Sequence, residues 1–166
     1  MKLMDVIRKR LSVRKYKPDP VPEEKIEYIL EAARLAPSWG NKQCWKYIVV
    51  TDENTKKELG VRDWVAEAPV IIVGCADPEQ SGHSHKIPYF AVDLGISMEH
   101  LILAAAELGL GTCWIGKHYE ENMVKKALRI PDNIRVVALT PLGYPDEDPE
   151  PRTRRSIEEI SVKNHW

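Results

Sequence analysis

Two basic clusters lie near opposite ends of the chain, and in each of them arginines alternate around a hydroxyl group. The first cluster contains Arg10, Ser12 and Arg14, and the second contains Arg152, Thr153 and Arg154. Alternate side chains of an extended segment point to the same side, and guanidinium groups that flank a hydroxyl suit a phosphate monoester. The sequence therefore predicts a phosphate site to which both clusters contribute. A solvated helix end with a charged linker, or more weakly a nucleic-acid patch, is the alternative.

A polar loop at residues 36–43 carries the second kind of candidate. Ser38, Asn41 and Gln43 offer both donors and acceptors and could read the edge of a heteroaromatic ring. The alternative is a turn in which the serine and the asparagine hydrogen-bond their own backbone.

A glycine-rich segment, residues 108–116, is the third candidate. Its glycines allow a ligand to approach the backbone closely. The segment is not a GxGxxG pattern and does not open a helix, so it does not support a Rossmann dinucleotide site. A helix stop followed by a strand explains Gly109 and Gly111, but explains Gly116 less well.

Size and charge narrow the class of protein. The chain has 166 residues and a formal net charge of −1, which fits one compact domain and excludes a generally basic nucleic-acid binder. The N-terminus lacks an apolar signal-peptide core, and the longest apolar run, residues 68–76, is broken by Pro69. We therefore expect a cytoplasmic protein with no membrane span.

Cysteine and histidine add no catalytic or metal-binding pattern. Cys44, Cys75 and Cys113 are tens of residues apart with no CxxC pair, which predicts reduced, mostly buried thiols. Cys44 has no obvious base beside it, so a nucleophilic role is not expected. His83 and His85 form an HxH pair without an evident third ligand, and we predict no metal site.

The elements that position these clusters follow from periodicity and capping signals. Helices are expected at 1–11, 22–36, 52–59, 89–108 and 120–128, and strands at 47–50, 70–73, 112–115 and 135–140. Residues 79–87 are expected to form a loop. This order predicts an α+β fold, a sheet of few strands covered by several helices.

Two features point to a second subunit. Residues 101–106 are apolar nearly all round, so this helix should be buried on every side, and a partner chain would help to cover it. The tail becomes Pro-rich and charged after Pro141 and then ends in an apolar stretch at 157–162. An arm over about 145–166 that docks on a partner explains both features of the tail.

In this order, the four clusters resemble the FMN-dependent nitroreductase family over nearly the whole chain. The resemblance implies an α+β sandwich with a mostly antiparallel central sheet flanked by helices, formed as a single FMN-binding domain by residues 1–166. It also implies an interlocked homodimer with exchanged C-terminal arms and two FMN molecules in the dimer interface.

The same resemblance implies roles for individual residues. Arg10, Ser12 and Arg14 would hold the phosphate and ribityl end of FMN, and Arg152 and Arg154 would reach the same phosphate. Pro37, Ser38, Trp39 and Asn41 of the other subunit would touch the isoalloxazine. The backbone at Ile115, Gly116 and Lys117 would donate hydrogen bonds to the flavin N5 and O4 edge. No side chain need act as acid or base, because the cofactor carries the chemistry.

The implied activity is an oxidoreductase that takes hydride from NADH or NADPH onto flavin N5. A planar acceptor such as a nitroaromatic or a quinone would then receive the electrons in a ping-pong cycle. The alternatives are a flavin-binding sensor or carrier without turnover, or a specialised branch such as reductive dehalogenation or flavin destruction. One departure concerns the lysine that members often place near flavin N1 and O2, because residues 60–66 contain Arg62 as their only cation.

Overall fold

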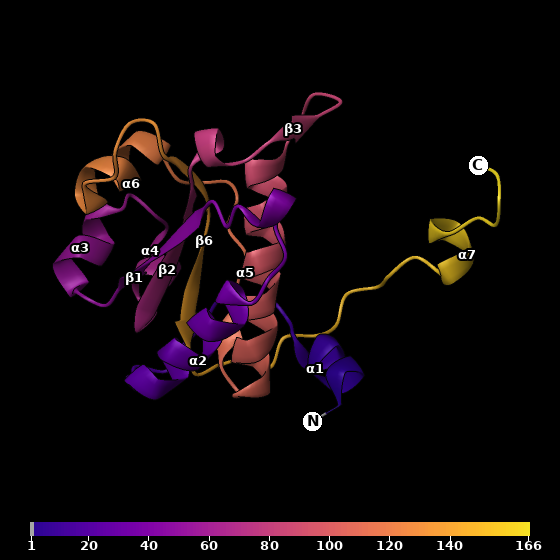
Figure 1. Ribbon diagram of the computed structural model, residues 1–166. Coiled ribbons are helices and arrows are strands. Elements are labelled where there is room, and N and C mark those ends of the chain that lie inside the picture. Colours follow the sequence, from indigo (N-terminus) through magenta and orange to yellow (C-terminus); the bar gives the residue numbers. More distant parts are fainter. Residues whose placement is uncertain (1) are drawn as a thin grey trace.

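A four-stranded antiparallel sheet forms the centre of the computed structural model, which describes residues 2–166 (Figure 1). The strand order is β1-β2-β6-β5. The strands are β1 (Trp45–Val50), β2 (Val70–Ala76), β5 (Gly111–Thr112) and β6 (Arg135–Gly143). Each neighbouring pair is antiparallel, which confirms the predicted α+β class and the antiparallel sheet.

Helices cover both faces of the sheet, and each face has its own apolar core (Figure 1). One face packs against α2 (Glu23–Arg34) and α5 (Tyr89–Glu107), and α1 (Leu3–Lys9) lies against α5. The other face packs against α3 (Glu53–Glu58), α4 (Asp63–Ala66) and α6 (Glu121–Leu128). Every residue of β2 is buried, because side chains that alternate across a central strand meet a core on either face.

Local signals place most helix starts and stops. The Asp52 side chain accepts a hydrogen bond of 2.8 Å from the Thr55 N–H, and this N-cap starts α3. The first helix is shorter than expected and ends at Lys9, because Arg10 already adopts an extended conformation; Met1 lies outside the described residues. The elements that the sequence analysis missed include α4 and a hairpin of β3 (His83–Ser84) and β4 (Ile87–Pro88).

The reason proposed for a partner over residues 101–106 was wrong. Ile102 is 3% exposed and Ala106 is 6% exposed within a single chain, since α1, α2 and the sheet already cover this half of α5. The exposed apolar side chains of α5 are Val92 and Ile96, in its first half. By length and composition α5 could cross a membrane, but half of that stretch is buried inside this fold.

The C-terminal segment leaves the body of the molecule and ends in α7 (Ile157–Ile160) (Figure 1). All residues from 151 to 166 are exposed. The root of the segment is fixed beside the first basic cluster. The Glu147 carboxylate accepts hydrogen bonds from the Arg14 and Lys15 N–H groups, and Lys15 pairs with Asp146 at 2.9 Å.

Candidate functional site

The first basic cluster lies on an extended segment at the edge of the sheet. The Val13 N–H donates to the Thr112 carbonyl at 2.9 Å, and Ser12 pairs with Thr112 in a parallel bridge. Val13 points into the core and is 5% exposed. It packs so closely on Gly111 that a Cβ there would lie 2.9 Å from the Val13 Cβ.

The alternation places the other side chains together. Arg10, Ser12 and Arg14 all line one cavity of about 250 Å³. Arg152 and Arg154 line the same cavity, because the fixed root at Asp146 and Glu147 directs the arm past the first cluster. The structure thus brings the two distant basic clusters into one place.

The charges in this cavity are poorly balanced within the chain. None of the four lining arginines (Arg10, Arg14, Arg152 and Arg154) forms an ion pair within residues 2–166. Glu150 is the one carboxylate among the lining residues that the structure describes. Guanidinium groups around a serine hydroxyl can bind a phosphate dianion through charge-assisted hydrogen bonds.

A second cavity, of about 260 Å³, adjoins the first, since Arg14 lines both. Its cations are Arg14, Arg62 and Lys117, and no carboxylate lines it among the residues described. Trp64 and Trp114 contribute aromatic surface. The cavity therefore offers apolar contact to a planar ring and positive charge to the polar edge of that ring.

One of the three expected backbone donors of the second cavity is already used within the chain. The Ile115 N–H donates to the Leu139 carbonyl at 2.9 Å, and Leu139 returns a bond of 3.0 Å to Ile115. Ile115 lines the cavity, but its N–H is already used by the sheet. The N–H groups of Gly116 and Lys117 make no hydrogen bond to any described residue, so these two can donate to a ligand.

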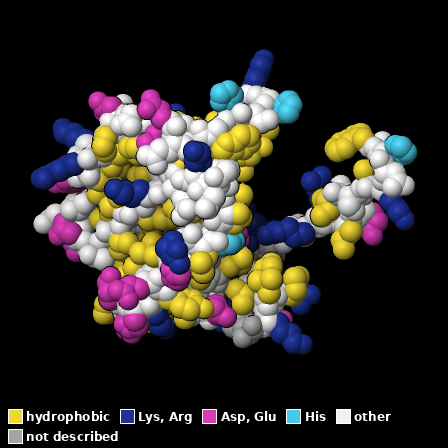
Figure 2. Space-filling model, in the orientation of Figure 1, with side chains coloured by type: hydrophobic (Ala, Val, Ile, Leu, Met, Phe, Trp, Pro, Cys, Tyr) yellow, Lys and Arg dark blue, Asp and Glu magenta, His cyan; other side chains and the backbone are white. Residues whose placement is uncertain are grey.

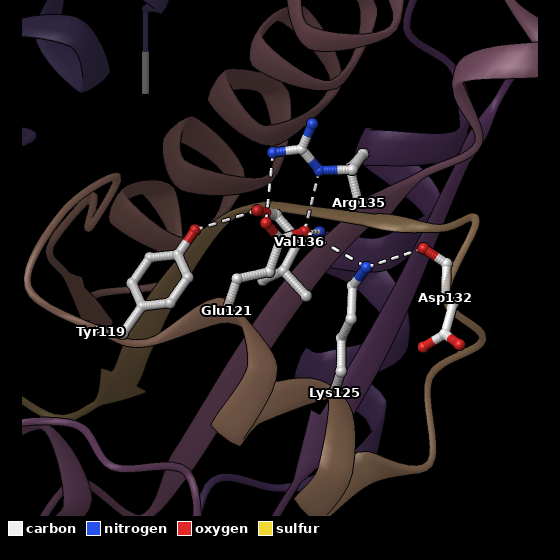
Figure 3. A network of polar contacts seen from close by, with 6 residues as sticks. All are labelled: Tyr119, Glu121, Lys125, Asp132, Arg135 and Val136. Atoms are coloured by element: carbon white, nitrogen blue, oxygen red, sulfur yellow. Dashed lines mark hydrogen bonds and ion pairs between the residues drawn. The ribbon is translucent and has the colours of Figure 1, made fainter.

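A polar network holds the segment that follows these donors (Figure 3). The Tyr119 hydroxyl donates to the Val136 carbonyl at 3.0 Å. The Glu121 carboxylate accepts from Arg135 Nε at 2.9 Å and from the Val136 N–H at 3.0 Å. The hydrogen bond from Arg135 lowers the pKa of Glu121. Loop residues 116–120 are thereby fastened to β6 directly after the donors.

The polar loop that contains Trp39 lies outside the lining of both cavities. Pro37, Ser38, Trp39 and Asn41 line neither of the two cavities. The Ser38 hydroxyl accepts from the Gln43 N–H at 2.9 Å, and Asn41 Oδ1 accepts from Gln43 Nε2 at 3.2 Å. These local bonds are the ones that a polar turn makes, and within one chain the loop contributes to neither cavity.

The three thiols are buried and form no disulfide. Burial raises the pKa of Cys44 and the pKa of Cys75, each to about 11. A protonated thiol is a poor nucleophile, so neither cysteine is suited to covalent catalysis.

Sequence reasoning missed several residues that shape this region. Trp64 and His118 line the second cavity, and Glu147 fixes the arm. Asp93, which is 1% exposed, accepts the Trp39 N–H at 2.9 Å. Of these residues, only Asp93 could have been noticed in the sequence, because it is an acidic residue within the long apolar helix. The others depend on contacts between distant segments.

Comparisons with known proteins agree with this geometry. The family model described as "Nitroreductase family" matches residues 7–62 and 56–144. A protein of Archaeoglobus fulgidus with the provisional name NADH dehydrogenase/NAD(P)H nitroreductase is 38% identical over 154 residues, covering 87% of this chain and 86% of its own.

Solved structures share the whole fold. A nitroreductase family protein from Clostridium novyi NT superposes with a TM-score of 0.84 at 40% identity, covering 89% of this chain and 87% of that one. An FMN-dependent nitroreductase from Clostridium difficile R20291 gives a TM-score of 0.87 at 28% identity, with 98% and 99% covered. The family model, the relatives and the shared fold together show that the chain belongs to the nitroreductase family.

Proposed function

We propose that this protein is an FMN-dependent oxidoreductase that uses NADH or NADPH as reductant. Its acceptor is a planar molecule such as a nitroaromatic or a quinone, and the two substrates use the same face in turn. One observation carries the proposal: a cavity lined by four arginines without ion-pair partners in the described chain shares Arg14 with a second cavity, which is lined by the backbone donors of Gly116 and Lys117.

The residues fit FMN at both ends. Arg10, Ser12, Arg152 and Arg154 provide the charge and the hydroxyl that a terminal phosphate requires. Arg14 lies between the two cavities, where the ribityl chain must pass. The N–H groups of Gly116 and Lys117 can donate to the N5 and O4 edge of the ring. When bound, FMN supplies the two-electron redox chemistry through its N5 atom.

Arg62 replaces the lysine that other members place near the pyrimidine edge. It lines the second cavity with Arg14 and Lys117. Fixed positive charge beside the place where negative charge grows stabilises the reduced state more than the oxidised one. These side chains act by position and charge, and none needs to transfer a proton.

The protein works as a homodimer in this proposal, with residues 1–166 as one domain and residues 145–166 as the exchanged arm. The support is apolar surface on three elements that one chain leaves open. On α1 this surface includes Leu3 and Met4, on α5 it includes Val92 and Ile96, and on the arm it includes Ile157. Hydrophobic side chains are visible over α1 and α7 (Figure 2). A partner would also supply Pro37, Ser38, Trp39 and Asn41 to the cavities. The cytoplasm is the proposed location.

Two measurements test the proposal. Acid release and chromatography of the chromophore should yield FMN, and recovery of FAD would contradict the assignment of the phosphate site. Anaerobic stopped-flow mixing of the holoprotein with NADH or NADPH should bleach the flavin within seconds. A flavin that neither reductant bleaches would favour a sensor or carrier without turnover.

A further inference from the structure

A two-residue turn makes the β3–β4 hairpin the most prominent projection near the start of α5 (Figure 1). His85 and Lys86 form its tip with φ of 51° and 69°, the left-handed pair that a tight hairpin turn requires. His83, His85 and Lys86 are exposed. Histidine and lysine side chains stand at the tip of this projection (Figure 2).

The root of the hairpin is packed against Trp39. The indole ring lies directly on the Gly82 backbone, because a Cβ at Gly82 would overlap it. The ring centroid of Tyr89 lies 4.5 Å from the ring centroid of Trp39. The Tyr89 N–H donates to the Gly82 carbonyl at 2.9 Å, which closes the hairpin at the point where it holds the indole.

A buried carboxylate locks this arrangement. Asp93 accepts hydrogen bonds from the backbone N–H of Trp39 and from the Ser81 hydroxyl, each at 2.9 Å. Its Oδ2 also lies 3.7 Å from Cys44 Sγ. One side chain on α5 therefore fastens the Trp39 loop and the segment that leads into the hairpin. Any molecule that contacts Trp39 has the hairpin at a fixed place beside it.

A hollow lies beside Trp39, and it is lined by one lysine and one glutamate. Trp39, Lys42 and residues 79–82 line a cavity of about 380 Å³. Lys42 is the ammonium group that lines the hollow, whereas Lys86, His83 and His85 are exposed on the hairpin beyond it. Glu79 is the acidic side chain that lines the hollow. Residues 83–88 add Lys86 and no carboxylate, so an anion that extends from Trp39 to the tip would meet two lysines and one lining carboxylate.

We propose that the hairpin at residues 83–88 recognises an anionic group carried by the planar molecule that stacks in the site. This inference rests on the proposed function, in which Trp39 of one chain reaches the flavin of the other. Two sources share this chemistry: a carboxylate on an aromatic acceptor, or the phosphates of the nicotinamide dinucleotide. Lys86 attracts the anion in either case and Glu79 repels it.

Equilibrium binding to the oxidised holoprotein tests the acceptor source without turnover. The probes are 4-nitrobenzoate and its neutral counterpart 4-nitrobenzyl alcohol, titrated by calorimetry at low salt. Lys86→Gln should weaken 4-nitrobenzoate about two- to five-fold, the range for one exposed charge pair. Glu79→Gln should tighten it by a similar factor. Neither change should alter the Kd of the alcohol, which also reports that the site is intact.

The dinucleotide source is tested by the rate of flavin bleaching with NADH against 1-benzyl-1,4-dihydronicotinamide, which has no phosphate. A loss confined to NADH in Lys86→Gln assigns the anion to the reductant, and a loss confined to 4-nitrobenzoate assigns it to the acceptor. Lys57→Gln, an exposed lysine on α3, is the matched control.

The triple variant His83→Gln, His85→Gln, Lys86→Gln removes all three polar tip groups. If it binds 4-nitrobenzoate and reacts with NADH as Lys57→Gln does, the proposal is overturned. If neither reductant bleaches the flavin of the parent protein, the proposed function and the hairpin proposal are both overturned. This result is obtained with the parent protein alone, so it is distinct from a failure of the hairpin proposal by itself.

Discussion

The charged side chains near the two ends of strand β6 differ in whether they have ion-pair partners. At its beginning, Glu121 pairs with Arg135 and Lys125, and Lys125 Nζ also donates to the Asp132 carbonyl at 3.0 Å (Figure 3). Near its end, β5 and the extended segment at residues 10–14 carry the cavity in which the arginines have no ion-pair partner among the described residues. The charged groups of the first region are paired within the described chain, whereas the arginines of the second region are not.

This difference indicates that the paired region contributes to the stability of the fold and that the unpaired region serves ligand binding. The Glu121 carboxylate accepts three hydrogen bonds and thereby stabilises the fold, and the Val136 N–H would lose its partner without it. Clustered like charges without partners repel one another and oppose folding slightly. A bound anion would neutralise them. We therefore expect substitutions at the two regions to act on different measurements.

The largest effect is expected from deleting the chain after Asp148. The deletion removes Arg152 and Arg154 together with the apolar side chains of α7. Each lost charge-assisted contact weakens binding by about ten- to a hundred-fold, so FMN affinity should fall at least about a hundred-fold. The protein should also sediment as a monomer. A folded, flavin-bound monomer would contradict both roles of the arm.

Single substitutions in the cavity should lower FMN affinity without unfolding the chain. Arg10→Ala and Arg154→Ala each remove about 1.5–3 kcal/mol of phosphate binding. Flavin titration should show about ten- to a hundred-fold weaker binding, while the apoprotein keeps its free energy of unfolding within about 0.5 kcal/mol. Arg34→Ala, which removes a surface pair with Glu31, is the control. Unchanged affinity in both site variants would mean that these arginines are only solvated.

The opposite pattern is expected at the other end of the strand. Glu121→Ala leaves the Val136 N–H without its acceptor and should lower the free energy of unfolding by about 1–3 kcal/mol. Urea denaturation of the apoprotein measures this loss. FMN affinity should change far less than in Arg10→Ala. Equal losses of affinity in the two variants would remove the distinction between the regions.

Asn41 tests whether the polar loop tunes the cofactor. If its amide hydrogen-bonds the flavin edge, Asn41→Ala should lower the two-electron midpoint potential by about 30 mV, the equivalent of about 1.4 kcal/mol. The bond of 3.2 Å between Asn41 Oδ1 and Gln43 supports the alternative, a role in loop shape. In that case redox titration at equal flavin occupancy should show an unchanged potential and denaturation a lower stability.

The smallest effect is a pH dependence of stability at Glu121. Arg135 lowers the folded-state pKa of this carboxyl, so ionised Glu121 stabilises the fold above the ordinary glutamate pKa of about 4.3. The contribution is lost as the pH falls through the lowered folded-state pKa. The difference in free energy of unfolding between the parent and Glu121→Gln should therefore shrink below about pH 4. A difference independent of pH would exclude this ion pair as its source.

Local signals in the sequence were sufficient for much of the fold. The Asp52 cap, the apolar spacing of Ile26, Ile29 and Ala33, and the alternation at residues 10–14 each depend on neighbours within one or two turns. The hairpin at residues 83–88 was missed because its turn uses His85 and Lys86 at positive φ, where glycine or asparagine is the usual signal.

The sequence by itself determined the α+β class, the family resemblance and the pairing of arginines with a hydroxyl at each end of the chain. Only the tertiary structure decided that the two clusters share a cavity, since this depends on Glu147 holding the arm beside Arg14. It alone showed that the Ile115 N–H is used by Leu139, and that Asp93 ties Trp39 to the hairpin root. These contacts join residues that lie from 12 to more than a hundred positions apart, and a local pattern of residue types does not reveal such partners.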